Sequence, residues 1–562
     1  MTRRDRGTVL ALVLILGLVA VLVALPDAGG GPAASVAPSA ASGTGGGSPP
    51  ATVYREGVLG SWTSITPISA ETAADRQLVA LVFAGLVRLG PGGDPVPDLA
   101  QSWTVDPKGR SYTFSLRPGA TWQDGSPVTA EDVAFTFRTL QDPGYTGPMG
   151  ISWRAVTVTA LDSSTVRFDL ATPLGGFLQA MTLPLLPAHL LAGMSPSQIA
   201  MSPFAATPVG SGRYRVASID RSRAVLERVA PAGEQTAGTS TAGSAGNLDR
   251  IELEFFPDQD ALVTAFTGGA LDAVAGLPPA AVASLAASDG TQVLRYPSAT
   301  LTAVVPNERG QSAFKSLAVR RALSIAIDRD AIVRDVMLGQ ATRADGLVPP
   351  SSWAFSASET PTIAFDRTAA TKALRSAGWT RGGGSWVAQG HSKPLVLQLI
   401  APDAATNALA FATAQAVAAA WRSIGFNVVL TGVSRDGLAK QLQTGTYMIA
   451  VVSVNLGLDP DLYPFLGSTQ ARTSGSNVAG VQSLVLDGLL RDARKPGSIT
   501  DRRKAYAKLQ GFLSTSGIIM PLYYADLSVV ASAALTGPTV REVADPGDRY
   551  WDVLTWRLAD GR

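Results

Sequence analysis

The chain has 562 residues, more than one ordinary domain holds, so two or three lobes are expected. Its hydrophobic content of 46% supports large cores, while its formal net charge of +2, spread along the chain, gives no basic footprint for nucleic acid. The absence of cysteine excludes disulfides, thiol nucleophiles and cysteine metal sites.

The first 50 residues have the pattern of a targeting or membrane segment followed by a linker. Arg3, Arg4 and Arg6 precede an unbroken apolar run at residues 8–25. As a helix at about 1.5 Å per residue this run is roughly 27 Å long, close to the thickness of a bilayer core. Residues 1–27 are therefore predicted to be a membrane anchor or a signal segment, with retention and cleavage both open. Residues 28–51, rich in Gly, Ala, Ser and Pro, are predicted to be a flexible linker.

The globular part is expected to begin near Thr52, with a strand at residues 53–59 and a helix at 72–86. Alternating apolar residues predict a strand at 111–116. Thr129 is placed to cap a helix whose first turn is acidic. Further elements follow from the same patterns: a strand pair within 153–170, strands at 213–219 and 251–255, and a helix at 258–266.

The second half of the chain predicts a parallel sheet. Strands at 395–400 and 427–431 flank a helix at 406–423, the pattern of a βαβ unit with a right-handed crossover. Helices are also expected at 314–330 and 501–513, and the polar, low-complexity residues 231–247 are expected to be a surface insertion.

Several short motifs occur in a specific order. PDLAQSW at 97–103 precedes YTFSLRPGATWQDGSPVTAEDVAFTF at 112–137, and PVGSGRY at 208–214 and VRRALSIAIDR at 319–329 follow. Together with LPLLPAHL at 183–190, they closely resemble the extracytoplasmic solute-binding proteins of family 5. Those receptors serve ABC importers of peptides, dipeptides and nickel, and the resemblance covers nearly all of residues 52–560.

The resemblance implies an α/β, two-lobed fold of the periplasmic-binding-protein type II, with a hinge of crossing strands. Lobe I would comprise residues 52–305 and 517–562, with a small α+β subdomain at about 88–205, and lobe II residues 306–516. The crossings are expected near 299–306 and 517–524. Such a receptor works by population shift, because its ligand binds the closed form more tightly than the open one.

Ligand contacts can be carried over only at positions that match the family. Asp459, in the segment VNLGLDPD, also precedes a proline and is therefore expected to cap the following helix. Peptide-binding relatives carry an acidic residue where this chain has Leu456, which favours an uncharged or differently held ligand. The candidate ligand-binding residues are Ser61, Trp62, Asn307, Trp353, Asn455 and Asp459.

The sequence gives little support for catalysis or for a metal or cofactor site. His189 and His391 lie far apart, and no HExxH, P-loop or GxSxG motif is present, so no catalytic residue, metal ligand or cofactor is predicted. The expected partners are a small ligand, the permease subunits of an ABC importer and the membrane, with the chain monomeric on the extracytoplasmic face. A ligand sensor or chaperone on the same fold, and an exported hydrolase, remain alternatives.

Overall fold

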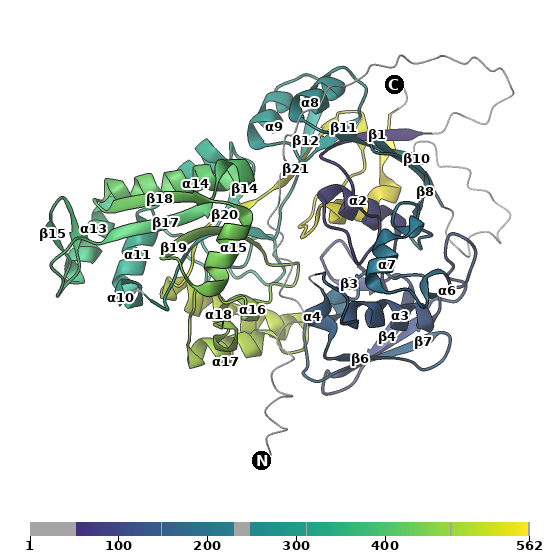
Figure 1. The fold of residues 1–562 in the computed structure, drawn as a ribbon, viewed down its shortest axis with the longest axis horizontal. Helices are drawn as coiled ribbons and strands as arrows, with labels where there is room; N and C mark the ends of the chain where they lie inside the picture. The colour runs from purple at the N-terminus through teal and green to yellow at the C-terminus, as the bar shows by residue number, and fades with distance from the viewer. Residues whose placement is uncertain (1–51, 148, 230–247, 311, 473–474, 560–562) are drawn as a thin grey trace.

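The computed structural model describes residues 52–147, 149–229, 248–310, 312–472 and 475–559. Two lobes lie side by side, each built on its own sheet (Figure 1). The expected anchor, linker and insertion at residues 1–27, 28–51 and 231–247 lie outside the described residues. Within the described ranges, no helix combines the length and the hydropathy that crossing a membrane requires.

Lobe I is built on a seven-stranded sheet. β1 (Val53–Leu59) pairs in parallel with both β10 (Arg250–Phe256) and β11 (Ala273–Ala275), so the strand predicted at 53–59 lies at the centre of the sheet. In sheet order the strands are β12 (Thr291–Tyr296), β21 (Leu527–Ser532), β11 (Ala273–Ala275), β1 (Val53–Leu59), β10 (Arg250–Phe256), β9 (Arg223–Arg228) and β8 (Tyr214–Ile219). The helices of this lobe are α2 (Ala73–Val82), α8 (Gln259–Thr267), α9 (Pro279–Ala286) and the 3-10 segment η5 (Pro546–Thr555). A short strand pair, β22 (Leu535–Thr536) with β23 (Arg557–Leu558), completes it.

A four-stranded antiparallel sheet forms the subdomain of lobe I. Tyr112, Phe114 and Leu116 are buried, which confirms the alternation predicted for this strand. In sheet order the strands are β4 (Ala100–Val105), β5 (Ser111–Leu116), β7 (Thr165–Leu170) and β6 (Val156–Ala160). The smaller elements here are β2 (Val87–Leu89), β3 (Pro95–Pro97), α4 (Gly150–Trp153), α5 (Phe177–Ala180), α6 (Ala188–Leu191), α7 (Pro196–Met201) and η1 (Pro203–Ala205).

Helix α3 (Ala130–Gln141) packs on this small sheet and begins as predicted. Thr129 and Asp132 form a capping box, in which each side chain pairs with the other residue's backbone N–H. Asp132 also accepts a hydrogen bond from the backbone N–H of Ala188 at 2.7 Å. The helix cap therefore anchors the α6 segment as well.

Lobe II is built on a six-stranded mixed sheet. β17 and β18 are parallel and joined by α14 (Ala404–Ser423), which confirms the predicted βαβ unit. In sheet order the strands are β14 (Ala341–Arg343), β20 (Met520–Ala525), β13 (Thr300–Pro306), β19 (Ile449–Asn455), β17 (Val396–Pro402) and β18 (Asn427–Val433). Its longer helices are α11 (Leu317–Ile325), α13 (Arg367–Ser376), α15 (Arg435–Thr444), α17 (Leu484–Ala493) and α18 (Ile499–Ser516). Its short elements are α10 (Ser312–Lys315), α12 (Arg329–Ala331), the π-turn η3 (Ile332–Val336), β15 (Thr380–Gly382), β16 (Ser385–Val387), α16 (Tyr463–Leu466) and η4 (Ser468–Gln470).

Two predicted helices differ from the structure. The helix expected at 72–86 ends at Val82, because Phe83 adopts extended dihedral angles. The helix expected at 314–330 is divided into three pieces. Ser316 is extended, and Asp328 leaves the helix to cap the next turn through the N–H of Ala331.

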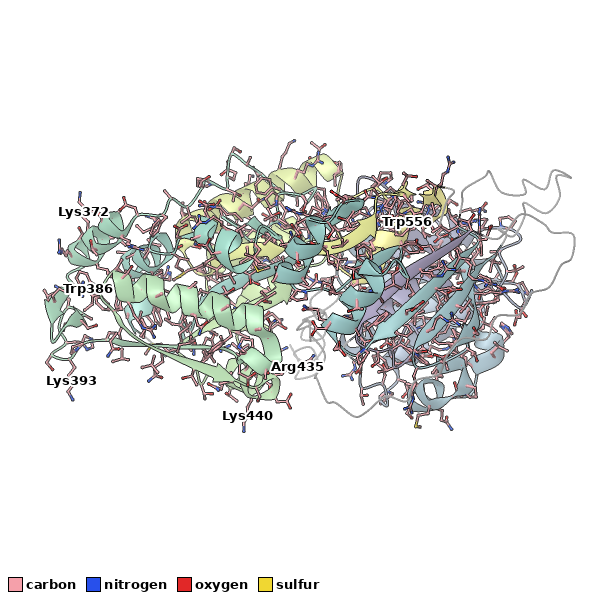
Figure 2. All side chains as sticks on the ribbon, turned by 90° about the horizontal axis from the view of Figure 1, so that it is seen from above. Lys372, Trp386, Lys393, Arg435, Lys440 and Trp556 are labelled. Carbon is pink, nitrogen blue, oxygen red and sulfur yellow. The ribbon has the colours of Figure 1, made fainter. Side chains whose placement is uncertain are left out.

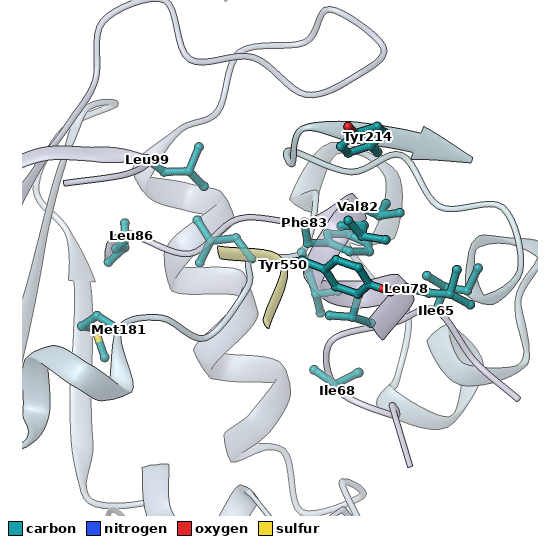
Figure 3. Packing of buried hydrophobic residues seen from close by; sticks show 14 of the residues in the cluster. Ile65, Ile68, Leu78, Val82, Phe83, Leu86, Leu99, Met181, Tyr214 and Tyr550 are labelled. Carbon is teal, nitrogen blue, oxygen red and sulfur yellow. The ribbon is translucent and has the colours of Figure 1, made fainter. Parts of the chain in front are cut away.

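Each lobe has its own hydrophobic core. In lobe I, α2 buries Leu78 and Val82 among residues from several distant segments (Figure 3). In lobe II, Trp386 and Trp421 are buried against the βαβ unit. Trp386 and Trp556, both fully buried, lie in opposite lobes (Figure 2). Separate cores allow each lobe to stay rigid while their relative orientation changes.

Candidate functional site between the lobes

The chain passes between the two sheets at two adjacent places. β12 of lobe I leads into β13 of lobe II through Pro297, Ser298 and Ala299. β20 of lobe II leads back into β21 of lobe I at Asp526. The strands at 300–306 and 520–525 both belong to the lobe II sheet, so these few residues are the connection between the lobes.

A third segment runs alongside the first crossing. The N–H of Ala299 donates to the carbonyl of Val543 at 2.9 Å, and the N–H of Val543 donates to the carbonyl of Pro297 at 2.9 Å. On the second crossing, the N–H of Asp526 donates to the carbonyl of Gln340 at 3.1 Å. We call the residues joined by these backbone bonds the hinge region.

Asn455 lies at this hinge. It is the last residue of β19 and pairs with Thr300, the first residue of β13. Its Nδ2 donates to the carbonyl of Ala544 in lobe I, and its Oδ1 accepts from the N–H of Gly457 at 2.8 Å. Asn455 therefore already joins the two lobes, and its neighbour Leu456 is buried.

Asp459 does not cap a helix, contrary to the expectation from the Asp-Pro sequence. Its two carboxylate oxygens accept hydrogen bonds from Nη1 and Nη2 of Arg502, at 2.7 and 2.8 Å. The hydroxyl of Tyr506 donates to the same carboxylate at 3.3 Å. The buried guanidinium of Arg502 needs a counter-charge, and that requirement outweighs the local capping preference.

Trp353 belongs to the same cluster. The guanidinium carbon of Arg502 lies 4.6 Å from the centre of its ring, a cation–π arrangement. The indole N–H donates to the carbonyl of Leu458 at 3.2 Å, and Tyr506 packs edge-on against the ring. The structure therefore brings together two of the candidate ligand residues, Trp353 and Asp459.

Ser61 and Trp62 lie in the loop at the C-terminal end of the central strand of the lobe I sheet. They follow β1, whose C-terminal end lies beside the hinge end of β21 through the shared neighbour β11. Ser61 is exposed, whereas Trp62 donates its indole N–H to the carbonyl of Asp220 at 2.8 Å.

Asn307 is not brought to the hinge. It follows the far end of β13, a strand of seven residues that spans about 23 Å at the usual rise. Its amide is buried, donates to the carbonyls of Gly445 and Tyr447 at 2.8 Å, and accepts from the N–H of Arg309 at 3.1 Å. Both amide hydrogens are used inside lobe II, so Asn307 has a structural role here.

Two carboxyl groups at the hinge were missed by the sequence analysis. Burial raises the pKa of Glu542 to about 8, although Ser351 of lobe II hydrogen-bonds to it and lowers the pKa in part. Burial likewise raises the pKa of Asp526 to about 6, partly offset by Arg295. Each has one buried carboxylate oxygen without a hydrogen-bond partner. No local motif marks either residue, because its burial depends on how the lobes meet.

The two histidines occupy unrelated places. His189 Nε2 lies 2.8 Å from Asp124 Oδ2 on the surface of lobe I, and His391 is exposed in lobe II. Among the residues that the structure describes, no three His, Cys, Asp or Glu side chains are grouped closely enough to hold a metal ion.

The sequence and the fold were compared with known proteins. The family model of the bacterial extracellular solute-binding proteins, family 5 (middle), matches residues 94–477. This chain belongs to that family. Most of the predicted motifs, from the PDLAQSW segment to the Asp-Pro step, lie inside the matched range.

Individual relatives agree with the family assignment. The nickel-binding periplasmic protein of Escherichia coli is 25% identical over 488 residues, covering 84% of this chain and 89% of that protein. A putative ABC transporter peptide-binding protein of Brucella ovis is 29% identical over 319 residues, covering 54% of this chain and 57% of that protein. The crystal structure of NikZ from Campylobacter jejuni in complex with Ni(L-His) superimposes with a TM-score of 0.70 at 23% identity, covering 90% of this chain and all of NikZ. The type II periplasmic-binding-protein fold is therefore confirmed.

Proposed function

We propose that this protein captures a small solute between its lobes and delivers it to an ABC importer. The observation that supports this most directly is the pair of lobes, each with its own sheet, between which the described chain crosses at residues 297–299 and 526, beside a third segment. Such a connection permits closure around a ligand, and closure is what a transporter can recognise. Family membership adds that the solute is bound outside the cytoplasm.

We further propose that the ligand contacts lie at the hinge edge, around Ser61, Trp62, Trp353 and Asn455. The relatives' names include peptide and nickel ligands. Neither class has its expected anchor here: Leu456 is apolar and buried, and the described residues contain no cluster of three His, Cys, Asp or Glu side chains that could hold a metal ion. An uncharged or otherwise held organic solute fits this lining better.

Native mass spectrometry of the full chain, purified in mild detergent, tests the proposal. We expect a co-purified small molecule, released on unfolding, that stabilises the protein when it is added back. At a hundredfold excess over its Kd, such a ligand adds about 2.7 kcal/mol to the free energy of unfolding. Broad peptide, sugar and metal-chelate libraries that produce no thermal shift would count against solute capture.

We propose binding without chemical change, because the family and the relatives compared above are binding proteins. Turnover of a chromogenic substrate panel by the purified chain would contradict this. We also propose that residues 1–27 tether a monomeric protein to the extracytoplasmic face of the membrane. Membrane fractionation and light scattering test those two points separately.

A further inference from the structure

The lobes touch at a second place, away from the hinge. The N–H of Gly175, in the lobe I subdomain, donates to the carbonyl of Arg494 in lobe II at 2.7 Å. Gly109, in the β4–β5 turn, lies against Pro496. In Figure 1 the α16–α18 group adjoins the subdomain, opposite the strands that cross at the hinge. We call this contact, of Gly109 and Gly175 with Arg494, Lys495, Pro496 and Arg502, the interlobe seam.

The lobe I side of the seam is firmly held. Gly175 lies between Leu174 and Phe177, both buried in the core of the lobe. The hydroxyl of Tyr112 donates to the carbonyl of Leu174 at 3.3 Å, and its ring packs against Phe177 with ring centres 4.4 Å apart. The backbone N–H of Gly175 is therefore presented by a packed core.

The lobe II side is held by two buried carboxylates of the Asp459-Pro460-Asp461 segment. Asp459 binds Arg502 through both oxygens, and Oδ2 of Asp461 lies 2.9 Å from Nε of Arg494. Arg494 and Arg502 flank the turn between α17 and α18, so the two ion pairs fix that turn from both ends. The guanidinium of Arg494 also stacks on Tyr463, 4.8 Å from the ring centre.

The seam requires glycine. A Cβ atom added at residue 175 would lie 2.7 Å from Nε of Arg502 and 2.8 Å from the carbonyl oxygen of Lys495, both in the opposite lobe. These distances are shorter than real Cβ contacts, so the Arg502 side chain and the backbone at Lys495 would have to move away from residue 175. Gly175 is absent from the residues with positive φ, so a side chain there strains no backbone angle and acts through the contact alone.

We propose that the interlobe seam is a latch that sets the balance between the open and closed forms, and that Asp459 and Asp461 are its positioning residues. Each contact of the seam joins the two lobes, so separating the lobes breaks it, and the seam stabilises the closed form selectively. The Asp-Pro-Asp segment then acts on closure through the seam, separately from any contact that its neighbour Trp353 makes with the solute. This proposal concerns the protein without added solute and does not depend on which solute binds.

Energy transfer between two labels measures closure directly. The chain has no cysteine, so Ser163→Cys in the subdomain and Lys440→Cys in lobe II, both at exposed positions, give a clean labelling pair. We expect Gly175→Val to lower the ratio of closed to open molecules by about tenfold or more, since it removes the seam selectively from one of two states. Gly488→Ala is the matched control, because a Cβ there meets nothing within 4 Å.

A folded Gly175→Val protein with the distance distribution of the control would overturn the latch. Circular dichroism establishes folding, and Gly175→Ala serves as the milder variant if Val disrupts the loop. Asp461→Asn should shift the distribution in the same direction, whereas a merely structural role in lobe II would leave it unchanged.

A disulfide provides an independent measurement. A Cβ at residue 109 would lie 3.0 Å from Cβ of Pro496, and a shift of about 0.5 Å or more brings the two atoms to the separation that a disulfide bridges. The Gly109→Cys, Pro496→Cys double variant should therefore form an intramolecular disulfide under mild oxidation, and adding Gly175→Val should slow it. Absence of the bond, or an unchanged rate, would refute the seam. Both results are obtained without solute, so they leave the proposed solute capture to its own test.

Discussion

Each lobe contains a buried, bidentate arginine–carboxylate pair, and the two pairs differ in their surroundings. In lobe I, Arg549 of η5 binds Glu56 of β1 through both terminal nitrogens, and Gln77 and Tyr550 complete its contacts. In lobe II, Arg502 binds Asp459 in the same bidentate manner. The lobe I pair is sealed within one core, whereas the lobe II pair faces Gly175 of the other lobe.

The comparison shows that a buried ion pair takes its role from what surrounds it. The lobe I pair joins residues 493 positions apart and ties the end of the chain to its first strand. The lobe II pair spans 43 positions and shapes a surface that meets another lobe. Since burying two charges is costly, such pairs are weak contributors to stability but strict requirements of geometry.

The largest effect is expected from breaking the lobe I pair. Arg549→Met leaves Glu56 buried without its counter-charge, which costs about 3–5 kcal/mol of unfolding free energy. Urea unfolding followed by tryptophan fluorescence should show this loss, while the label distances in the protein that remains folded stay unchanged. A loss below about 1 kcal/mol would mean that water or a neighbour replaces the arginine.

Asp459→Asn breaks the corresponding ion pair in lobe II. The amide keeps one acceptor for Arg502 but removes the counter-charge, so we expect a loss of about 2 kcal/mol, typical of a hydrogen bond to a charged group. Unlike Arg549→Met, it should also open the lobes in the label-distance measurement. If both variants opened the lobes equally, the distinction between the two pairs would fail.

The hinge acid Glu542 gives a pH-dependent test of the interface between lobes. An unfolded glutamate titrates near pH 4.3, whereas burial raises the pKa of folded Glu542 to about 8. Between these values the folded chain keeps a proton that the unfolded chain has lost, so stability falls as pH rises and levels off above about pH 8. Relative to Glu542→Gln, the natural protein should lose about 3.5 kcal/mol of unfolding free energy between pH 5 and 8.

Unfolding curves at four or five pH values, recorded for both proteins, check this slope. Parallel curves for the natural protein and Glu542→Gln would show that the carboxyl is ionised in the folded state.

The smallest effect is expected at an exposed pair. Arg334 and Asp335 form a bidentate contact on the surface of lobe II, with two thirds of the arginine side chain exposed. Arg334→Ala should leave the free energy of unfolding unchanged within the error of the measurement, because solvent screens such pairs. It serves as the baseline for the three variants above, and a larger loss would imply a contact other than the ion pair.

Local patterns account for most of the secondary structure. Alternation at Tyr112, Phe114 and Leu116 predicted β5, and Thr129 predicted the start of α3, since both signals act over a few residues. The order of motifs also predicted the two-lobed family fold. The sequence predicted the residues of the candidate site only in part. Asn455 lies at the hinge, but Asn307 lies at the far end of β13.

The sequence by itself determined where most strands and helices begin, because capping, turn chemistry and hydrophobic periodicity are short-range effects. It indicated the fold through the resemblance of its ordered motifs to the family. Only the tertiary structure decided the partner of each buried charge. The sequence Asp459-Pro460 predicts a helix start, yet the Asp459 carboxylate binds the buried guanidinium of Arg502 instead. Gly175 likewise resembles an ordinary loop glycine until the turn at Arg494, 319 positions away, is seen against it. Desolvation and close contact depend on residues that chain order separates, and they are settled when the lobes pack.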